Sequence, residues 1–191
     1  MPINTSLYTV EAVVIVDNKG KRLFAKYYKA PHEDAVEDIV INKKKQLQFE
    51  KDLFGKTFKQ GNNEIILFDN HAVVYNEFPD SILYVIGSLG ENEVLLYNVL
   101  QGLSGALEIV LKNEVDKRSI QEFYDLVVLA IDETIDDGIV LETDSTAIAA
   151  RVTNAPAEDV SNIKIDLSER GFLNAFKFAK KNLSERLQQG F

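Results

Sequence analysis

Three short apolar runs joined by tight turns do most to limit what this chain can fold into. The runs cover residues 64–68, 71–78 and 82–88, and the turns between them are Asp69-Asn70 and Pro79-Asp80. Turns this short connect antiparallel neighbours, so the pattern predicts three consecutive strands joined by hairpins.

A further hairpin is predicted near the start of the chain. Residues 7–16 are almost entirely apolar or β-branched, as expected of a strand that is buried on both faces, and residues 22–28 return as its partner. Together with the three later strands, this hairpin predicts a five-stranded, mainly antiparallel sheet in an α+β fold.

A helix is predicted between the two groups of strands, at residues 34–54. Its main apolar stripe has the helical period and contains Val36, Val40, Leu47 and Phe54. Phe49 and Leu53 project well away from that stripe. They therefore predict a second apolar surface, which a monomer would expose and a partner would cover.

A second helix is predicted from a cap at Asn92 to about Lys112. Apolar residues, Leu96 and Leu100 among them, occupy more than half of its circumference, so it should be buried on most sides. Gly102 and Gly105 cost helix stability, and close approach to the sheet is the expected compensation.

The stretch 119–144 is dense in carboxylates. Ser119 and Glu122 have the spacing of a capping box, which predicts a helix that begins at Ser119 and is stopped by Gly138 in the left-handed conformation. Asp144 or Ser145 is then expected to cap another helix that runs through about Val152.

An alternative interpretation gives these carboxylates a chemical role. Asp132 and Asp136 lie four residues apart on the predicted helix, a spacing that can hold a hard cation, and with Asp137 they suggest an acidic metal-dependent hydrolase. The loop pattern of an EF-hand does not occur, however, and the capping interpretation explains the same residues.

Three regions are predicted along the chain. Residues 1–152 form the sheet domain, residues 153–167 form a linker around Pro156, and residues 168–191 form a C-terminal amphipathic helix. The apolar face of that helix contains Phe172, Phe176 and Leu183.

Composition excludes several classes of protein. The chain has no cysteine, which rules out disulfides and thiolate sites and suits a reducing cytosol. Its net charge of −9 opposes binding to nucleic acid or to an anionic membrane. No leader or membrane-spanning run is expected, and the basic run at 43–45 is predicted to be a solvated helix face.

Catalytic and cofactor motifs are not found in the sequence. The phosphate-binding glycine patterns do not occur, and Gly102-Leu103-Ser104-Gly105 lacks the spacing of a nucleophile elbow. His32 and His71 are predicted to be solvated loop histidines, and two distant histidines cannot close a zinc site. We therefore predict no catalytic residue, no metal and no cofactor.

Several segments resemble the coatomer zeta chains, a family related to the sigma chains of clathrin adaptors. The resemblance extends over nearly the whole chain and implies the longin or SNARE-like fold of vesicle-coat small subunits. The similar segments are residues 7–13, 25–28, 50–54, 129–138, 141–145 and 174–180.

This resemblance implies a non-enzymatic coat subunit. The partners that it implies are the large coatomer gamma subunit in an obligate heterodimer, other coatomer subunits, and indirectly an Arf-type GTPase. It also implies a cytoplasmic protein, peripheral on Golgi membranes and COPI vesicles in retrograde and intra-Golgi transport. The residues predicted to contact the partner are Phe49, Leu53, Phe54, Leu96, Leu100 and Phe176.

A second hypothesis is a longin-type module that regulates a small GTPase or the SNARE machinery. It predicts either a SNARE coiled coil after the domain or a second longin-like chain as partner. Sustained heptads do not follow Asp144, which argues against the first form.

Overall fold

The computed structural model describes residues 6–29, 40, 42–60, 64–112 and 115–153. The predicted C-terminal helix at 168–191 lies outside these residues, as does the predicted linker apart from Thr153. The start of the helix predicted at 34–54, with Val36, also lies outside them.

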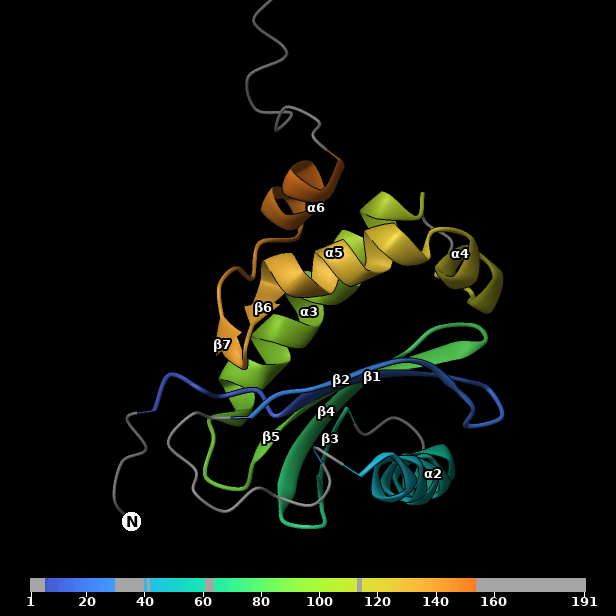
Figure 1. Cartoon of the computed structure of the whole chain (residues 1–191), viewed down its shortest axis with the longest axis vertical. Helices are drawn as coiled ribbons and strands as arrows, with labels where there is room; N and C mark the ends of the chain where they lie inside the picture. Colours follow the sequence, from blue (N-terminus) through green and yellow to red (C-terminus); the bar gives the residue numbers. More distant parts are fainter. Residues whose placement is uncertain (1–5, 30–39, 41, 61–63, 113–114, 154–191) are drawn as a thin grey trace, which may run out of the picture. The chain divides into compact units, whose positions relative to one another are not determined.

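The core of the fold is a five-stranded sheet in which all neighbouring strands are antiparallel (Figure 1). The strand order is β2-β1-β5-β4-β3, so the two predicted hairpin groups meet where β1 pairs with β5. The predicted five-stranded sheet is confirmed. Its strands are β1 (Ala12–Asp17), β2 (Arg22–Tyr27), β3 (Ile65–Phe68), β4 (His71–Glu77) and β5 (Ser81–Ser88).

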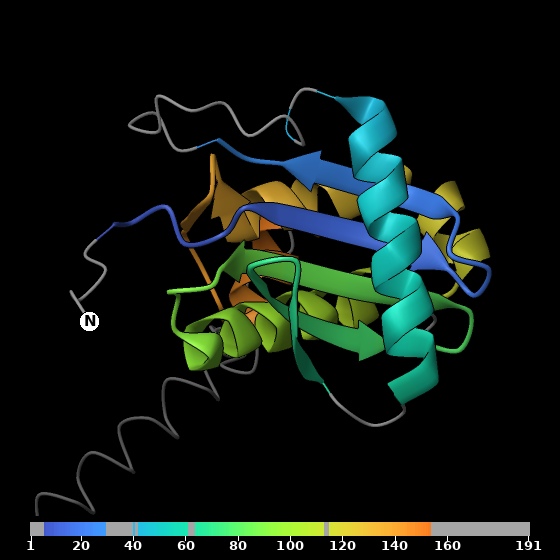
Figure 2. The same cartoon turned by 90° about the horizontal axis from the view of Figure 1, so that it is seen from below.

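Helices cover both faces of the sheet. Helix α2 (Lys43–Gln60) crosses one face, as Figure 2 shows from below. On the opposite face lie α3 (Glu93–Val110), α4 (Lys117–Glu122) and α5 (Tyr124–Thr134), and α6 (Ser145–Thr153) packs on α3 and α5 (Figure 1). The sheet is therefore the middle layer of three.

Alternation along β1 explains this arrangement. All six of its residues are buried. Val13 and Ile15 belong to the apolar cluster beneath α3, whereas Val14 and Val16 belong to the cluster beneath α2. Because successive side chains of a strand point to opposite faces, a strand without polar positions needs cover on both sides.

Helix α3 begins as predicted, since the side chain of Asn92 accepts a hydrogen bond of 3.0 Å from the Val94 amide. The expected role of its glycines is wrong. A methyl group on Gly102 would collide with the carbonyl of Thr143, and one on Gly105 would lie 3.0 Å from Cβ of Ser145. The glycines therefore make room for the start of α6, not for the sheet.

The capping box predicted at Ser119 is also wrong. Asp116 is the N-cap, and its carboxylate accepts a hydrogen bond of 2.7 Å from the Ser119 amide. The single predicted helix is two helices, α4 and α5, which are divided at Phe123. Asp116 accepts from the amide of Ser119 itself, which makes Ser119 the third residue of α4 and not its cap.

Gly138 has the predicted left-handed conformation but a different role. Helix α5 ends at Thr134, and Asp137 and Gly138, with φ of 47° and 86°, form the turn of a small hairpin. Its strands are β6 (Ile135–Asp136) and β7 (Ile139–Val140). The helix that follows is capped as predicted, since Asp144 accepts a hydrogen bond of 2.8 Å from the Ala147 amide.

Asp17, which is 1% exposed, connects the β1–β2 hairpin to α4 through hydrogen bonds. One carboxylate oxygen accepts hydrogen bonds of 2.9 Å from the amides of Lys19 and Lys21, and the other accepts one of 2.8 Å from the Lys117 ammonium. Burial raises the pKa of Asp17, but these hydrogen bonds outweigh burial and the net pKa is below its ordinary value.

We expect Asp17→Asn to lower the free energy of unfolding at pH 7 by about 1–3 kcal/mol, because it removes a buried charged acceptor. A lowered folded-state pKa stabilises the fold above about pH 4, and this contribution is lost as the pH falls through the folded-state pKa. Urea unfolding at pH 7 and pH 3 should show the difference from wild type shrinking in acid. A constant difference, or an equal one for exposed Asp52→Asn, would contradict the assignment.

We expect Gly102→Ala to destabilise the fold by about 1–3 kcal/mol, because the added methyl meets backbone that cannot move freely. The matched control is Gly55→Ala in the exposed middle of α2, where nothing lies within 4 Å. That change should stabilise the helix by up to about 1 kcal/mol. Thermal unfolding of both variants checks the prediction, and equal melting temperatures would refute it.

Candidate interaction surfaces

Four of the residues predicted to contact a partner lie in the core of the chain itself. Phe49 and Leu53 are 6% and 0% exposed and pack against the sheet, so the prediction that they form a second exposed surface is wrong. Leu96 and Leu100 belong to α3 and are fully buried in the core cluster on the other side of the sheet. A charged substitution at any of these positions should unfold the domain, not merely weaken an interface.

The remaining two predicted contact residues have different positions. Phe54 is half-buried and stacks on the exposed Phe58, with ring centroids 5.3 Å apart. Phe176 lies outside the described residues. Of the main stripe predicted for this helix, Leu47 is exposed, whereas Phe54 packs partly buried against the cluster that contains Phe49 and Leu53.

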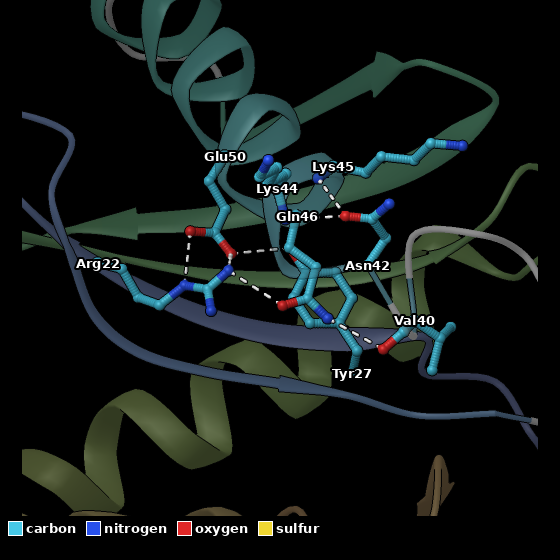
Figure 3. Close-up of polar contacts among 8 residues, drawn as sticks. All are labelled: Arg22, Tyr27, Val40, Asn42, Lys44, Lys45, Gln46 and Glu50. Atoms are coloured by element: carbon cyan, nitrogen blue, oxygen red, sulfur yellow. Dashed lines mark hydrogen bonds and ion pairs between the residues drawn. The ribbon is translucent and has the colours of Figure 1, made fainter.

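A buried ion pair joins α2 to the edge strand β2 (Figure 3). The Arg22 guanidinium donates through Nε to one oxygen of Glu50 at 2.8 Å and through Nη2 to the other oxygen. The side chain of Glu50 is 2% exposed and that of Arg22 is 20% exposed. This two-point contact fixes both orientation and distance between helix and strand.

Neighbouring polar groups complete the Arg22–Glu50 cluster. The Tyr27 hydroxyl donates to Glu50 at 2.9 Å, and Gln46 accepts from Arg22 at 3.2 Å while donating to the Val40 carbonyl at 3.1 Å (Figure 3). Burial, reinforced by the negative charge of Glu50, raises the pKa of Tyr27 far above its ordinary value. The phenol thus stays a donor, and both Glu50 oxygens are occupied by structural contacts.

We expect Glu50→Ala to lower the free energy of unfolding by about 3 kcal/mol, since it leaves the Arg22 charge partly buried without its partner. Glu133→Ala is the matched control, because Glu133 forms an exposed pair with Arg151 at 3.7 Å and should cost less than about 1 kcal/mol. Chemical unfolding of both variants measures the difference. Similar losses would show that the Arg22–Glu50 pair is not a special contact.

The outer face of α2 is basic. The helix contains six lysines and two acidic residues, and one of those, Glu50, points inward. Lys44 and Lys51 lie on the exposed side with Leu47 and Phe58, and Figure 2 shows no other described element covering that side. As predicted, residues 43–45 are solvated.

The opposite side of the molecule is acidic. Residues 116–153, which form α4, α5, the β6–β7 hairpin and α6, contain nine carboxylates and three basic side chains. Asp132, a ligand in the metal hypothesis, instead accepts a hydrogen bond of 2.7 Å from Lys26. Within the described residues, no three acidic or histidine side chains are grouped so that they can hold a metal ion.

Apolar side chains are exposed at several places on the surface. On the edge strand β3, Ile66 points into the core while Ile65 and Leu67 are exposed on the other face. Exposed apolar residues mark an interaction site only where they form a contiguous patch. The exposed apolar residues of the described part are Leu7, Leu47, Phe58, Ile65, Leu67, Leu89, Val94, Ile109, Phe123, Tyr124, Leu129 and Leu141.

His71 is not the solvated histidine that was predicted. It begins β4, and its Nδ1 lies 2.6 Å from a carboxylate oxygen of Glu11. Its ring also packs edge-on against Phe49, with centroids 5.5 Å apart. His32 lies outside the described residues.

The Arg22–Glu50 pair was missed by the sequence analysis. Its members are 28 residues apart, so no local spacing connects them. One signal was available, because Glu50 lies between Phe49 and Leu53 on the helix face that now proves to be buried. A carboxylate on such a face requires a cationic partner.

The described helices include none that is long and apolar enough to cross a membrane.

Comparison with known proteins gives consistent results. The family model of the clathrin adaptor complex small chain matches residues 9–159. Coatomer subunit zeta of Saccharomyces cerevisiae is 49% identical over 97% of this chain and 97% of its own length. Coatomer subunit zeta-1 of Oryza sativa is 37% identical over 94% of this chain and 96% of its own, and the human zeta-1 is 41% identical over 78% and 80%.

One solved-structure comparison supports the fold. A chain in a homology model of the full-length AP-3 complex in a stretched open conformation matches with a TM-score of 0.54 and 16% identity. The match covers 76% of this chain and 92% of that chain. At this identity the likeness concerns the fold, which is that of an adaptor small chain.

Proposed function

Because this chain belongs to the coatomer zeta family of adaptor-complex small chains, we propose that it pairs with the large gamma subunit of coatomer in the COPI coat. Membership makes it a small subunit of a vesicle coat. The observation that carries the proposal is the 49% identity to a coatomer zeta chain, because it extends over 97% of both chains.

The proposed role is structural and not enzymatic. In this role the chain takes part in Golgi-to-ER retrograde and intra-Golgi transport, on the cytosolic face of Golgi membranes and COPI vesicles. An Arf-type GTPase and the other coatomer subunits are reached through the larger subunits. The negative net charge is consistent with membrane attachment through the larger subunits, since it disfavours direct binding of this chain to an anionic leaflet.

The surface of the described part is consistent with stable pairing. Obligate interfaces bury more than about 2,000 Å² and resemble a domain core cut in half. Exposed apolar residues such as Phe58, Leu67 and Val94 could be buried in such an interface. The side chains of Phe49, Leu53, Leu96 and Leu100 are already buried in the core and are not available for it. Pairing would also stabilise the chain itself by mass action.

The two alternative functions have less support. A longin-type regulator of a GTPase or SNARE would share the fold, but the relatives reported above are coat subunits. The hydrolase hypothesis needs Asp132, Asp136 and Asp137 around a metal, and the described residues do not provide that arrangement.

Co-expression with the gamma subunit tests the proposal. We expect a 1:1 complex in light scattering and a higher melting temperature than that of the free chain, because binding favours the folded state. The large subunit of a clathrin adaptor is the control and should not bind. A chain that stays monomeric beside the gamma subunit, or that binds a GTP-loaded small GTPase directly instead, would refute the proposal.

A further inference from the structure

A continuous row of exposed residues runs along the outer face of α2. Lys44, Leu47, Lys51, Gly55 and Phe58 are all exposed and follow one another at intervals of three or four residues. Residues at these intervals are neighbours on a helix surface, so the row is contiguous, and it is about 21 Å long. We call these five residues the α2 ridge. In Figure 2 no other described element lies over it.

The α2 ridge has a gap at Gly55. This residue lies inside the helix, where glycine costs stability relative to alanine. A Cβ atom added there would meet nothing within 4 Å, so no close packing in the described part of the chain requires the glycine. A glycine on an exposed helix face does, however, allow the backbone of another chain to approach closely.

An aromatic ring at one end of the α2 ridge is already held in position. Phe58 is 68% exposed, and its ring stacks on that of Phe54 with centroids 5.3 Å apart. Phe54 packs against the cluster beneath α2, and a Cβ atom on Gly20 would lie 2.6 Å from its ring, so it has little room to move. Binding therefore costs Phe58 little side-chain entropy, which favours it as an anchor of an interface.

The lysines of the α2 ridge have no acidic partner in the described part of the chain. None of the ion pairs there includes Lys44 or Lys51. Lys56 of the same helix differs, because its ammonium donates to a backbone carbonyl of β3 at 3.0 Å. The exposed carboxylate of Asp52 accepts hydrogen bonds of 2.8 and 2.9 Å from the Gln48 amide. Two positive charges on the α2 ridge are thus left for another molecule to pair with.

We propose that the α2 ridge binds an acidic, amphipathic helix of the large subunit with which this chain pairs. This inference rests on the proposed function and names one of its contacts. A straight ridge with a gap fits a second helix, because packed helices place the ridge of one in the groove of the other. Carboxylates of the partner pair with Lys44 and Lys51, and its apolar side chains cover Leu47 and Phe58.

A lipid surface and a second copy of this chain fit the α2 ridge less well. An anionic leaflet attracts lysines, but it has no backbone to use the space above Gly55, and the net charge of −9 opposes it. A second copy offers the acidic side of residues 116–153. A contact between two different faces, however, continues from copy to copy into an open filament unless its rotation closes a ring.

The first test removes the charge of the α2 ridge from the full chain. Lys44→Gln with Lys51→Gln keeps long side chains of similar helix propensity, so the melting temperature of the free chain should not change. We expect the Kd for the gamma subunit to rise about tenfold at low salt, and the ratio to wild type to shrink at high salt, as for exposed charges at an interface.

The matched control removes the same charge from the other side of the sheet. Lys112 follows α3 and Arg118 lies in α4, and both are exposed. Lys112→Asn is used there because asparagine tolerates the left-handed backbone, with its φ of 59°, and Arg118→Gln is combined with it. This control should leave the Kd within about twofold of wild type.

Gly55→Gln gives a readout that a purely structural role would not produce. Glutamine is a better helix former and enters open space, so the melting temperature of the free chain should rise. The Kd for the gamma subunit should nevertheless rise about fivefold or more, because the new side chain fills the space that the partner backbone needs. A variant that is more stable and binds as tightly as wild type would overturn the inference.

Phe58→Gln tests the aromatic anchor. We expect the Kd to rise about tenfold, because anchors of this kind contribute a large share of binding energy. Ile109→Gln is the control, since Ile109 is an apolar residue of α3 that is 47% exposed and lies on the other side of the sheet. It should leave the Kd within about twofold of wild type.

The outcomes separate this inference from the proposed function. If wild type binds the gamma subunit and the α2 variants bind equally well, the α2 ridge is not a contact, although the proposed function stands. An equal loss in the Lys112/Arg118 control would reduce the effect to net charge and overturn the inference. Self-association, or binding to phosphatidylserine vesicles, that is lost in the Lys44/Lys51 variant while the gamma subunit still binds would also overturn it. If wild type does not bind the gamma subunit, both proposals fail.

Discussion

Burial of the central strands on both faces is the constraint on which the rest of this structure depends. β1 and β5 pair in the middle of the sheet, and seven of the eight residues of β5 and all six of β1 are buried. One helical layer cannot cover both faces, so α2 and the group of α3, α4 and α5 must lie on opposite sides. The Arg22–Glu50 pair then joins α2 to β2, the strand at one edge of the sheet.

Charge follows from the same constraint. Because the core is almost entirely apolar, most charged side chains lie on the outer faces of the two helical layers. Exposed lysines of α2 such as Lys44 and Lys51 lie on one side and the carboxylates of residues 116–153 on the other. Although the net charge of the chain is negative, its surface has one basic face and one acidic face. Each face favours a partner of the opposite charge.

Local sequence patterns predicted the helices and strands better than they predicted which residues pack against each other. Hairpin turns such as Asp69-Asn70 fix strand order locally, so the sheet could be predicted from the sequence. Periodicity in α2 shows apolar stripes but not which one meets the sheet, and for that reason Phe49 and Leu53 were assigned to a partner. Arg22 and Glu50 meet only through the tertiary fold. Asp116 is the cap in place of Ser119 because its side chain accepts from the amide of Ser119, so the helix begins before that residue.

A small chain can keep its fold through large changes in sequence while its partners change. The likeness to a chain of the AP-3 complex at 16% identity concerns strand order and helical layers, which depend on apolar pattern and not on particular side chains. Specificity for a large subunit must then come from outward groups, which folding leaves free to vary. Buried Phe49 and Leu53 cannot distinguish one partner from another, whereas exposed residues such as Phe58 and Leu67 can.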